Sequence, residues 1–183
     1  MVYDIILILI FRKENQVIFY FANYVLDVDV DRTRSYYERT DVPTMSQQCD
    51  CIDCQNFDEA ILKASGKVLD FLRCLGIDPQ KPVETFNVTG VLEDDGSIWY
   101  NGWYHICGSI LGGPETVKKE LLPDGSEHFE YCWENSYAPD MDFPFKVLPV
   151  KERYLLHEEF PTPVIQLEID THLPYVLTNK FEE

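Results

Sequence analysis

The sequence predicts an α+β protein in which one long amphipathic helix, over about residues 57–75, packs on a mostly antiparallel sheet. Apolar residues recur every three or four positions in that segment, and the chain after it divides into apolar, alternating segments separated by turn residues. The chain has 183 residues, 14% of them aromatic, which suffices for a single hydrophobic core. Residues 31–183 are therefore expected to form one α+β domain.

Both ends of the helix are predicted. Asn56 is a suitable N-cap, and Glu59 stands three positions on, where a capping-box carboxylate reaches back to the first turn. Gly76 fits the left-handed position that follows a helix, and Pro79 prevents its continuation. The apolar stripe consists of Phe57, Ile61, Ala64, Val68, Phe71, Leu72 and Leu75.

The sheet is predicted from the segments that follow the helix. The first two, Glu84–Leu92 and Ser97–Cys107, flank an Asp-Gly turn and predict a hairpin. The second of them carries the aromatic run 99–105, which indicates either sheet core or the lining of a ligand pocket. Three further strands are expected after it: Glu127–Tyr137, Phe145–Leu156 and Val164–Ile169.

Residues 1–30 differ in composition from the rest of the chain. They are rich in Ile, Val, Phe and Tyr and contain neither Gly nor Pro. This composition predicts two strands, Ile5–Phe11 and Val17–Val25. An alternative is that the segment is translated from an upstream start, so that the functional chain begins near Val30 or Met45.

Asp27, Asp29 and Asp31 alternate with valines, and with Glu38 they have the spacing of positions 1, 3, 5 and 12 of a calcium-binding loop. That loop requires glycine at position 6 for a sharp turn, and Arg32 stands there instead. The segment is therefore predicted to be an edge strand with one acidic face. The later acidic residues are also expected on a solvated face: Glu152, Glu158, Glu159, Glu168 and Asp170.

The composition is strongly acidic, because 15 Lys and Arg stand against 32 Asp and Glu, a net charge of −17. This balance disfavours direct binding to nucleic acid or to an anionic membrane, since phosphates are neutralised by Lys and Arg. We expect a basic protein partner instead. The alternative is that the acidity serves solubility alone.

The apolar segments indicate neither a membrane span nor a signal peptide. The strongest run, Ile5–Phe11, is far shorter than the roughly 20 residues that a transmembrane helix needs. It also lacks a basic start and a small-residue cleavage site. The clustered cysteines are typical of a metal or redox set rather than of an extracellular disulfide framework. A cytoplasmic protein is therefore expected, and the sequence leaves its oligomeric state open.

Cys49, Cys51 and Cys54 form the sharpest local motif, C-x-C-x-x-C. Three thiolates within six residues can converge on one zinc ion, and C-x-x-C is a common spacing of zinc ligands. Cys54 is expected just before the helix, where the helix dipole favours a thiolate. A structural zinc site is predicted here, with His105 as its fourth ligand and Cys107 or Cys132 as alternatives.

Two alternatives compete with a structural metal site. The thiols can be free and serve packing, since cysteine is among the most buried residue types. In the other alternative, Cys54 is a reactive nucleophile that is activated by the helix end and paired with His105 as its base. No local signature of a known cysteine hydrolase accompanies this pair.

Four stretches form a recognisable set: CDCIDCQNF (49–57), LGIDPQKPVE (75–84), GWYHICG (102–108) and FPTPVIQLEIDTHLPYVL (160–177). Together they resemble an uncharacterised bacterial protein group with C-x-C-x-x-C-x-N-F, L-G-I-D-P-x-K-P and G-W-[YF]-H motifs. The resemblance covers about residues 35–177 and implies one compact unit without an assigned activity. As a small acidic α+β domain, the chain is also similar to immunity proteins of bacterial toxin systems and to phage-encoded inhibitors.

These observations lead to one expected function and two alternatives. We expect a non-catalytic acidic binding protein of immunity or inhibitor type that neutralises a basic partner, such as a nuclease or a nucleic-acid-guided effector. The first alternative is a zinc- or thiol-dependent enzyme that uses Cys49, Cys51 and Cys54 with His105. The second is an assembly module whose acidity confers only solubility.

Overall fold

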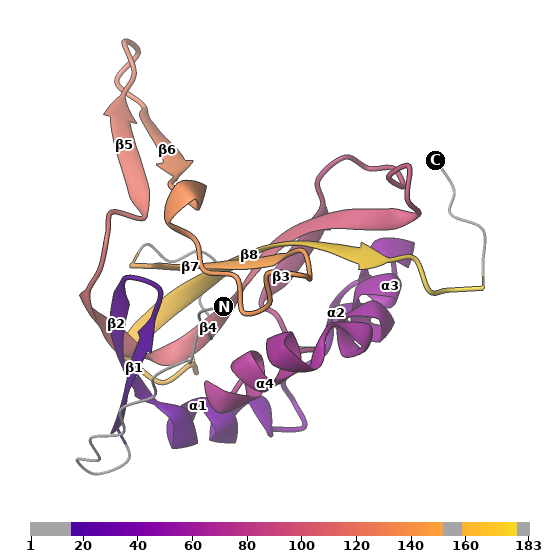
Figure 1. Ribbon diagram of the computed structural model, residues 1–183, viewed down its shortest axis with the longest axis horizontal. Helices are drawn as coiled ribbons and strands as arrows, with labels where there is room; N and C mark the ends of the chain where they lie inside the picture. The colour runs from indigo at the N-terminus through magenta and orange to yellow at the C-terminus, as the bar shows by residue number, and fades with distance from the viewer. Residues whose placement is uncertain (1–15, 152–158, 179–183) are drawn as a thin grey trace.

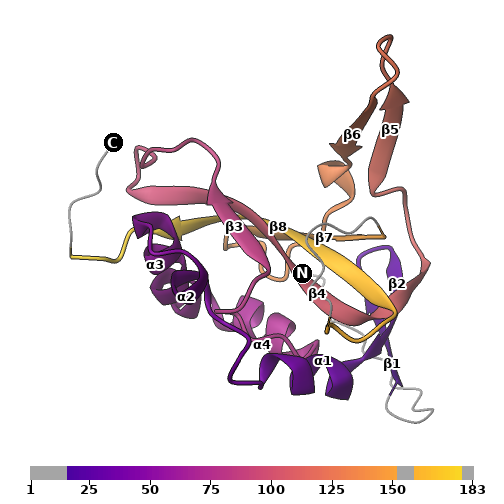
Figure 2. The same ribbon diagram turned by 180° about the vertical axis from the view of Figure 1, so that it is seen from behind.

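The computed structural model describes residues 16–151 and 159–178, and it has an α+β fold (Figure 1). Short helices lie along one face of an antiparallel sheet, and both views show them side by side on that face (Figures 1 and 2). The helices are α1 (Val30–Tyr37), α2 (Met45–Gln48), α3 (Ile52–Ala60) and α4 (Gly66–Cys74), with one 3-10 turn at Ile61–Lys63 and another at Trp133–Asn135.

The main sheet has the strand order β1-β2-β4-β8-β7, and β3 also pairs with β4. All of these pairings are antiparallel. A second sheet holds only β5 and β6. The strands are β1 (Gln16–Phe21), β2 (Tyr24–Asp29), β3 (Glu84–Asn87), β4 (Ser97–Gly112), β5 (Val117–Leu121), β6 (Glu127–Tyr131), β7 (Phe145–Val150) and β8 (Val164–Pro174).

The single long helix predicted over residues 57–75 is wrong, because this segment is two short helices. After α3 and the 3-10 turn, Ala64 turns to extended backbone with ψ of 161°. Ser65 then caps α4 by accepting a hydrogen bond from the Val68 N–H, and Gly66, a weak helix former, follows it. The apolar stripe is nevertheless buried along both helices, so the periodicity reported the core-facing side correctly.

The predicted start of the helix is also wrong, whereas its predicted end is confirmed. The helix begins at Ile52 with Cys51 as N-cap, and Asn56 lies buried in α3. At the other end, Gly76 has φ of 84°, and Ile77 N–H donates to the Leu72 carbonyl over 3.0 Å. This is the Schellman arrangement that a glycine after the last helical residue predicts.

The predicted hairpin is confirmed in β3 and β4, with Glu84 opposite Trp103 and Asn87 opposite Tyr100. Strand β3 ends earlier than expected, while β4 continues to Gly112 and pairs with β8, β3 and β2. Strand β6 ends six residues before the predicted Tyr137 and belongs to the separate two-stranded sheet. The predicted 145–156 strand ends at Val150, and its last five residues lie outside the described ranges.

Strand β4 has a gap along one edge, between the segment that pairs with β3 and the segment that pairs with β2. Two side chains of α1 fill it. The Tyr37 hydroxyl donates to the His105 carbonyl (2.9 Å) and accepts from the His105 N–H (3.1 Å). The Thr33 hydroxyl accepts from the Cys107 N–H (2.9 Å). Buried backbone groups that no strand reaches are thus satisfied by a helix.

The N-terminal prediction needs two corrections where residues are described. The predicted strand Val17–Val25 is divided by a turn at Ala22, whose φ is 47°, so that β1 and β2 form a hairpin. Strand β2 is not an edge strand, because it pairs with both β1 and β4. Asp29 caps α1 by accepting from the Arg32 N–H. The predicted strand Ile5–Phe11 lies outside the described residues.

Within the described ranges, no helix is long and apolar enough to cross a membrane. The core lies between the helices and the main sheet. Its fully buried side chains include Phe57 and Leu72 from the helices and Tyr100, Tyr104 and Ile106 from β4.

Deletion of residues 1–29 should abolish cooperative thermal unfolding. It removes the fully buried Leu26 and Val28 together with the pairing of β2 to β4, and each buried aliphatic side chain contributes about 1.5–3 kcal/mol. Deletion of residues 1–15 keeps every described strand and is the matched control. A folded chain beginning at Val30 would support the upstream-start alternative.

Gly76→Ala should lower the free energy of unfolding by more than about 2 kcal/mol in urea denaturation. A Cβ there adds backbone strain and would lie 2.7 Å from the Val30 carbonyl oxygen and 2.9 Å from the Arg34 nitrogen. Gly96→Ala is the control, because Gly96 has φ of 80° but open space around it, and its cost should be about 1 kcal/mol. Equal costs for the two variants would contradict the steric part of this explanation.

Candidate metal centre

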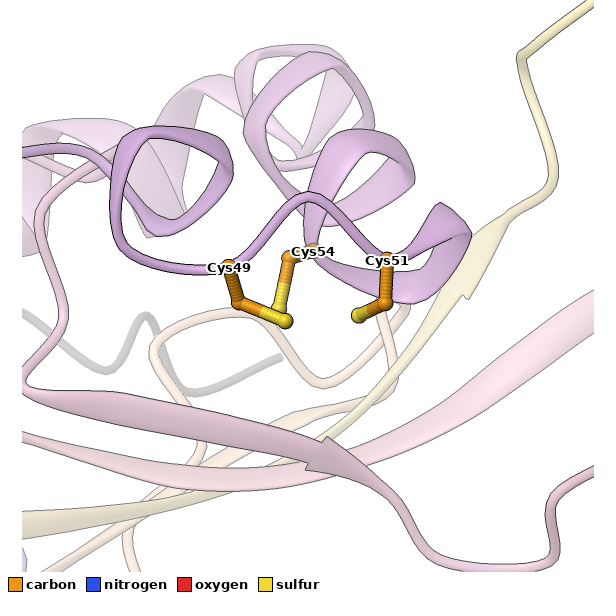
Figure 3. Close-up of side chains that lie close together, drawn as sticks. All are labelled: Cys49, Cys51 and Cys54. Atoms are coloured by element: carbon orange, nitrogen blue, oxygen red, sulfur yellow. The ribbon is translucent and has the colours of Figure 1, made fainter.

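The three cysteines of the C-x-C-x-x-C motif lie together at the turn between α2 and α3 (Figure 3). Cys49 follows the last residue of α2, Cys51 is the N-cap of α3, and Cys54 lies in the first turn of α3. Their Sγ atoms all lie within 4.8 Å of one another. In a tetrahedral zinc site with Zn–S bonds of 2.3 Å, two sulfurs are about 3.8 Å apart. The triad can therefore hold a single metal ion after only a small contraction.

The turn is held by hydrogen bonds between the two helices that flank it. The Asp58 carboxylate of α3 accepts from the backbone N–H groups of Met45 (3.1 Å) and Ser46 (3.0 Å), so it caps the N-terminus of α2. The Thr44 N–H donates to the Gln47 side chain in a capping box. Because these bonds hold α2 against α3, only a short turn connects the two helices. The three cysteine side chains project from the same side of this turn (Figure 3).

A hydrogen bond from the sheet also holds the start of α3. The Tyr100 hydroxyl of β4 donates to the Asp53 carbonyl over 2.9 Å. The same hydroxyl accepts a hydrogen bond from the Asn56 side-chain amide (3.2 Å). That amide also donates to the Pro174 carbonyl (3.2 Å), and its oxygen accepts from the Val176 N–H (2.8 Å). Asn56 is therefore a buried link between α3 and the end of β8 rather than the N-cap that the sequence predicted.

The three thiols differ in exposure and in acidity. Cys49 and Cys51 are exposed, and Cys54 is buried. The pKa of Cys49 is lowered, because its sulfur accepts hydrogen bonds from the Cys51 backbone and from the Cys51 and Cys54 thiols. The pKa of Cys54 is raised, first by burial and then by its two neighbouring thiols. Burial thus outweighs the helix dipole that was expected to favour a Cys54 thiolate, and Cys49 is the more acidic thiol.

The predicted fourth ligand His105 is not brought to the triad. Successive side chains of a strand point to opposite faces, so His105 lies on the face of β4 opposite Tyr100, which contacts α3. Its ring is fully buried, with Nε2 3.3 Å from Gln166 Oε1 and its centre 5.5 Å from that of Phe160. The proposed catalytic pair of Cys54 and His105 is therefore not assembled in this structure.

The alternative fourth ligands also lie elsewhere. Cys107 is buried on the same face of β4 as His105, and Cys132 is buried at the base of the β5–β6 hairpin. Among residues 16–151 and 159–178, no fourth His, Cys, Asp or Glu joins the three thiols. The described residues thus bring three thiols together, and this triad is exposed to solvent at Cys49 and Cys51.

A buried polar cluster that the sequence did not reveal lies on the face of the sheet opposite the helices. Glu168 was expected on a solvated face, but it is only 5% exposed. Its Oε1 accepts from the Tyr131 hydroxyl (2.8 Å) and from the Gln166 amide (2.5 Å). Burial raises the pKa of the Glu168 carboxyl, and these two hydrogen bonds oppose the shift. The sequence did carry one signal for the burial of Glu168: apolar residues surround it in β8, as is typical of a strand that is covered on both faces.

The aromatic run of β4 divides between the two faces of the sheet. Tyr100 and Tyr104 are fully buried toward the helices, as the core interpretation predicted. Trp99 lies on the opposite face, where it stacks on His172 with ring centres 5.6 Å apart and donates to Asp170 over 2.9 Å. These residues form packed cross-strand pairs.

Comparison with known proteins gives no match: no family model, no curated protein and no solved structure matches this chain. The resemblance to a bacterial group with a C-x-C-x-x-C-x-N-F motif therefore stays a prediction.

The Glu168→Gln variant should change how stability depends on pH. A carboxyl whose folded-state pKa lies above its unfolded value stabilises the fold fully below the unfolded pKa, and this contribution is lost as the pH rises through the folded pKa. The variant lacks this titration but keeps an oxygen acceptor. In urea denaturation at pH 5 and pH 8, the wild type should therefore lose stability relative to the variant as the pH rises. A difference that is the same at both values would contradict the role of Glu168 burial.

Proposed function

We propose that the protein binds one zinc ion through Cys49, Cys51 and Cys54. The observation that carries this proposal is the mutual approach of the three sulfur atoms to within 4.8 Å at a turn between two fixed helices. Thiolate ligands select soft and borderline ions, zinc among them, over oxygen-preferring ions such as magnesium and calcium. Because residues 16–151 and 159–178 supply three ligands and no fourth, the proposed centre keeps one position that those residues do not fill.

Ion binding is supported better than nucleophilic chemistry at Cys54. A reactive cysteine needs a lowered pKa and a nearby base. The pKa of Cys54 is raised by burial, and His105 lies on the other face of β4. A zinc-dependent enzyme is the alternative within this proposal, since a water in the open fourth position of zinc can become a nucleophile.

Freshly purified protein should contain about one zinc per chain by elemental analysis, and chelation should release thiols that titrate freely. Cys51→Ser should weaken zinc binding by more than about 100-fold, because it removes a ligand, yet leave the fold intact, because Cys51 is exposed. Cys54→Ser should weaken binding and also lower stability, because Cys54 is buried.

The matched control is Cys74→Ser, which alters a thiol outside the triad and should keep full zinc stoichiometry. Wild-type protein that carries no metal, takes up none from added zinc and has freely titrating thiols would contradict the proposal.

A second candidate function is that of a non-catalytic acidic binding protein of immunity or inhibitor type. The specific observation in its favour is the net charge of −17, which speeds encounter with a basic surface and selects against acidic ones. A nuclease or a nucleic-acid-guided effector is the natural basic target. Mixing with purified effectors of these kinds should give a complex that weakens as salt rises. Complexes that form equally well at high salt would speak against a charge-driven partner.

A further inference from the structure

The β5–β6 hairpin projects from the body of the protein as a separate two-stranded sheet (Figures 1 and 2). An isolated two-stranded hairpin is only marginally stable in water. Nearly all of its side chains are exposed: only Val117 is buried, and Tyr131 is half-buried. The hairpin therefore contributes little to the core, and most of its side chains are available for contact with another molecule.

One face of the hairpin carries four apolar side chains, Val117, Leu121, Phe129 and Tyr131, together with Lys119 and Glu127. The register pairs Val117 with Tyr131, Lys119 with Phe129 and Leu121 with Glu127, so these six side chains share a face. Leu121 is 72% exposed, and Phe129 and the adjacent Leu122 are each 36% exposed. We call Leu121, Leu122 and Phe129 the hairpin patch. Large apolar side chains gathered on one projecting element are typical of an interaction site.

The base of the hairpin is fixed to the body, which holds the patch in a defined position. The Tyr131 hydroxyl donates to the buried Glu168 carboxylate. Two further interactions brace the base of the hairpin internally: the Cys132 N–H donates to the Thr116 carbonyl, and Lys118 forms an ion pair with Glu134 over 3.2 Å. A preorganised patch loses less conformational entropy on binding than a free loop would lose.

The charges around the patch indicate what kind of surface it fits. Residues 115–134 carry six carboxylates and two lysines. Lys118 is paired with Glu134, and Lys119 lies over the Phe129 ring at 5.2 Å. The exposed carboxylates of Glu120, Glu127 and Glu130 therefore dominate the rim. A second copy of this chain would be repelled, since each chain carries −17.

We propose that the hairpin patch is the docking site for a basic partner protein, and that it enters an apolar groove flanked by Lys and Arg side chains. The proposal rests on the second candidate function and adds the place of contact. Leu121, Leu122 and Phe129 supply the apolar anchor, and the carboxylates around them pair with the cations that flank the groove.

The test uses the full-length protein labelled with ¹⁵N and two synthetic probes of equal charge: a helical Lys/Leu peptide and a Lys/Ser peptide. The Lys/Leu peptide should bind more tightly and shift amide signals within residues 117–131. The double variant Leu121→Ser with Phe129→Ser should weaken its binding by at least about tenfold. Met141→Ser is the matched control, because Met141 is 83% exposed outside the hairpin, and it should leave binding unchanged.

The outcomes separate the docking site from the function on which it rests. Equal binding of both peptides, signal shifts outside residues 117–131, or unchanged binding by the double variant would overturn the hairpin patch while leaving a basic partner in place. Failure of both cationic peptides to bind at low salt would overturn the docking site and the acidic binding function together. Thermal melting of each variant checks that an exposed substitution has left the fold intact.

Discussion

The main-chain pairing of β4 is the interaction on which the rest of the structure depends. The strand pairs with β8 from Ser97 to Cys107, and its other edge is shared by β3 and β2. Its helix-facing side chains Tyr100 and Tyr104 reach into the helical layer, where their hydroxyls bond the Asp53 and Pro79 carbonyls. Because pairs this distant in sequence must form together, the sheet and the helices are expected to fold as one cooperative unit.

The cysteine centre depends on this framework even though its ligands are close in sequence. Tyr100 holds the start of α3 from the sheet, and Asp58 holds α2 on α3. The turn that carries Cys49 and Cys51 is thus fixed at both ends by the protein's own hydrogen bonds. A ligand set that is organised in advance loses little conformational entropy on binding an ion, so its affinity reflects the bonds that are formed. Within the described ranges, no fourth His, Cys, Asp or Glu side chain lies beside the three thiols, so one side of the triad stays open.

Local sequence patterns correctly predicted the features that are determined by residues close together in the chain. The end of α4 follows from Gly76, whose freedom to adopt positive φ needs no tertiary information. The cysteine triad follows from a spacing of six residues. The break at Ala64 was hidden because the apolar periodicity continues across it. The position of His105 could not be predicted either, because the face of β4 on which it lies is fixed by the register of β4 with β8 and by the contact of α3 with Tyr100. The apolar residues around Glu168 indicated a covered strand, but its partners Tyr131 and Gln166 are known only from the folded arrangement.

The hydroxyls of Tyr37 and Thr33 have a consequence for the behaviour of the protein in a crowded solution. Between β3 and β2, the edge of the longest strand would otherwise present unpaired N–H and C=O groups, which are templates for the addition of a foreign strand. Side chains from α1 occupy those groups and so close this opening. If α1 detached, these backbone groups would be free to pair with a strand of another chain. The helix therefore protects the sheet against aggregation in addition to packing in the core.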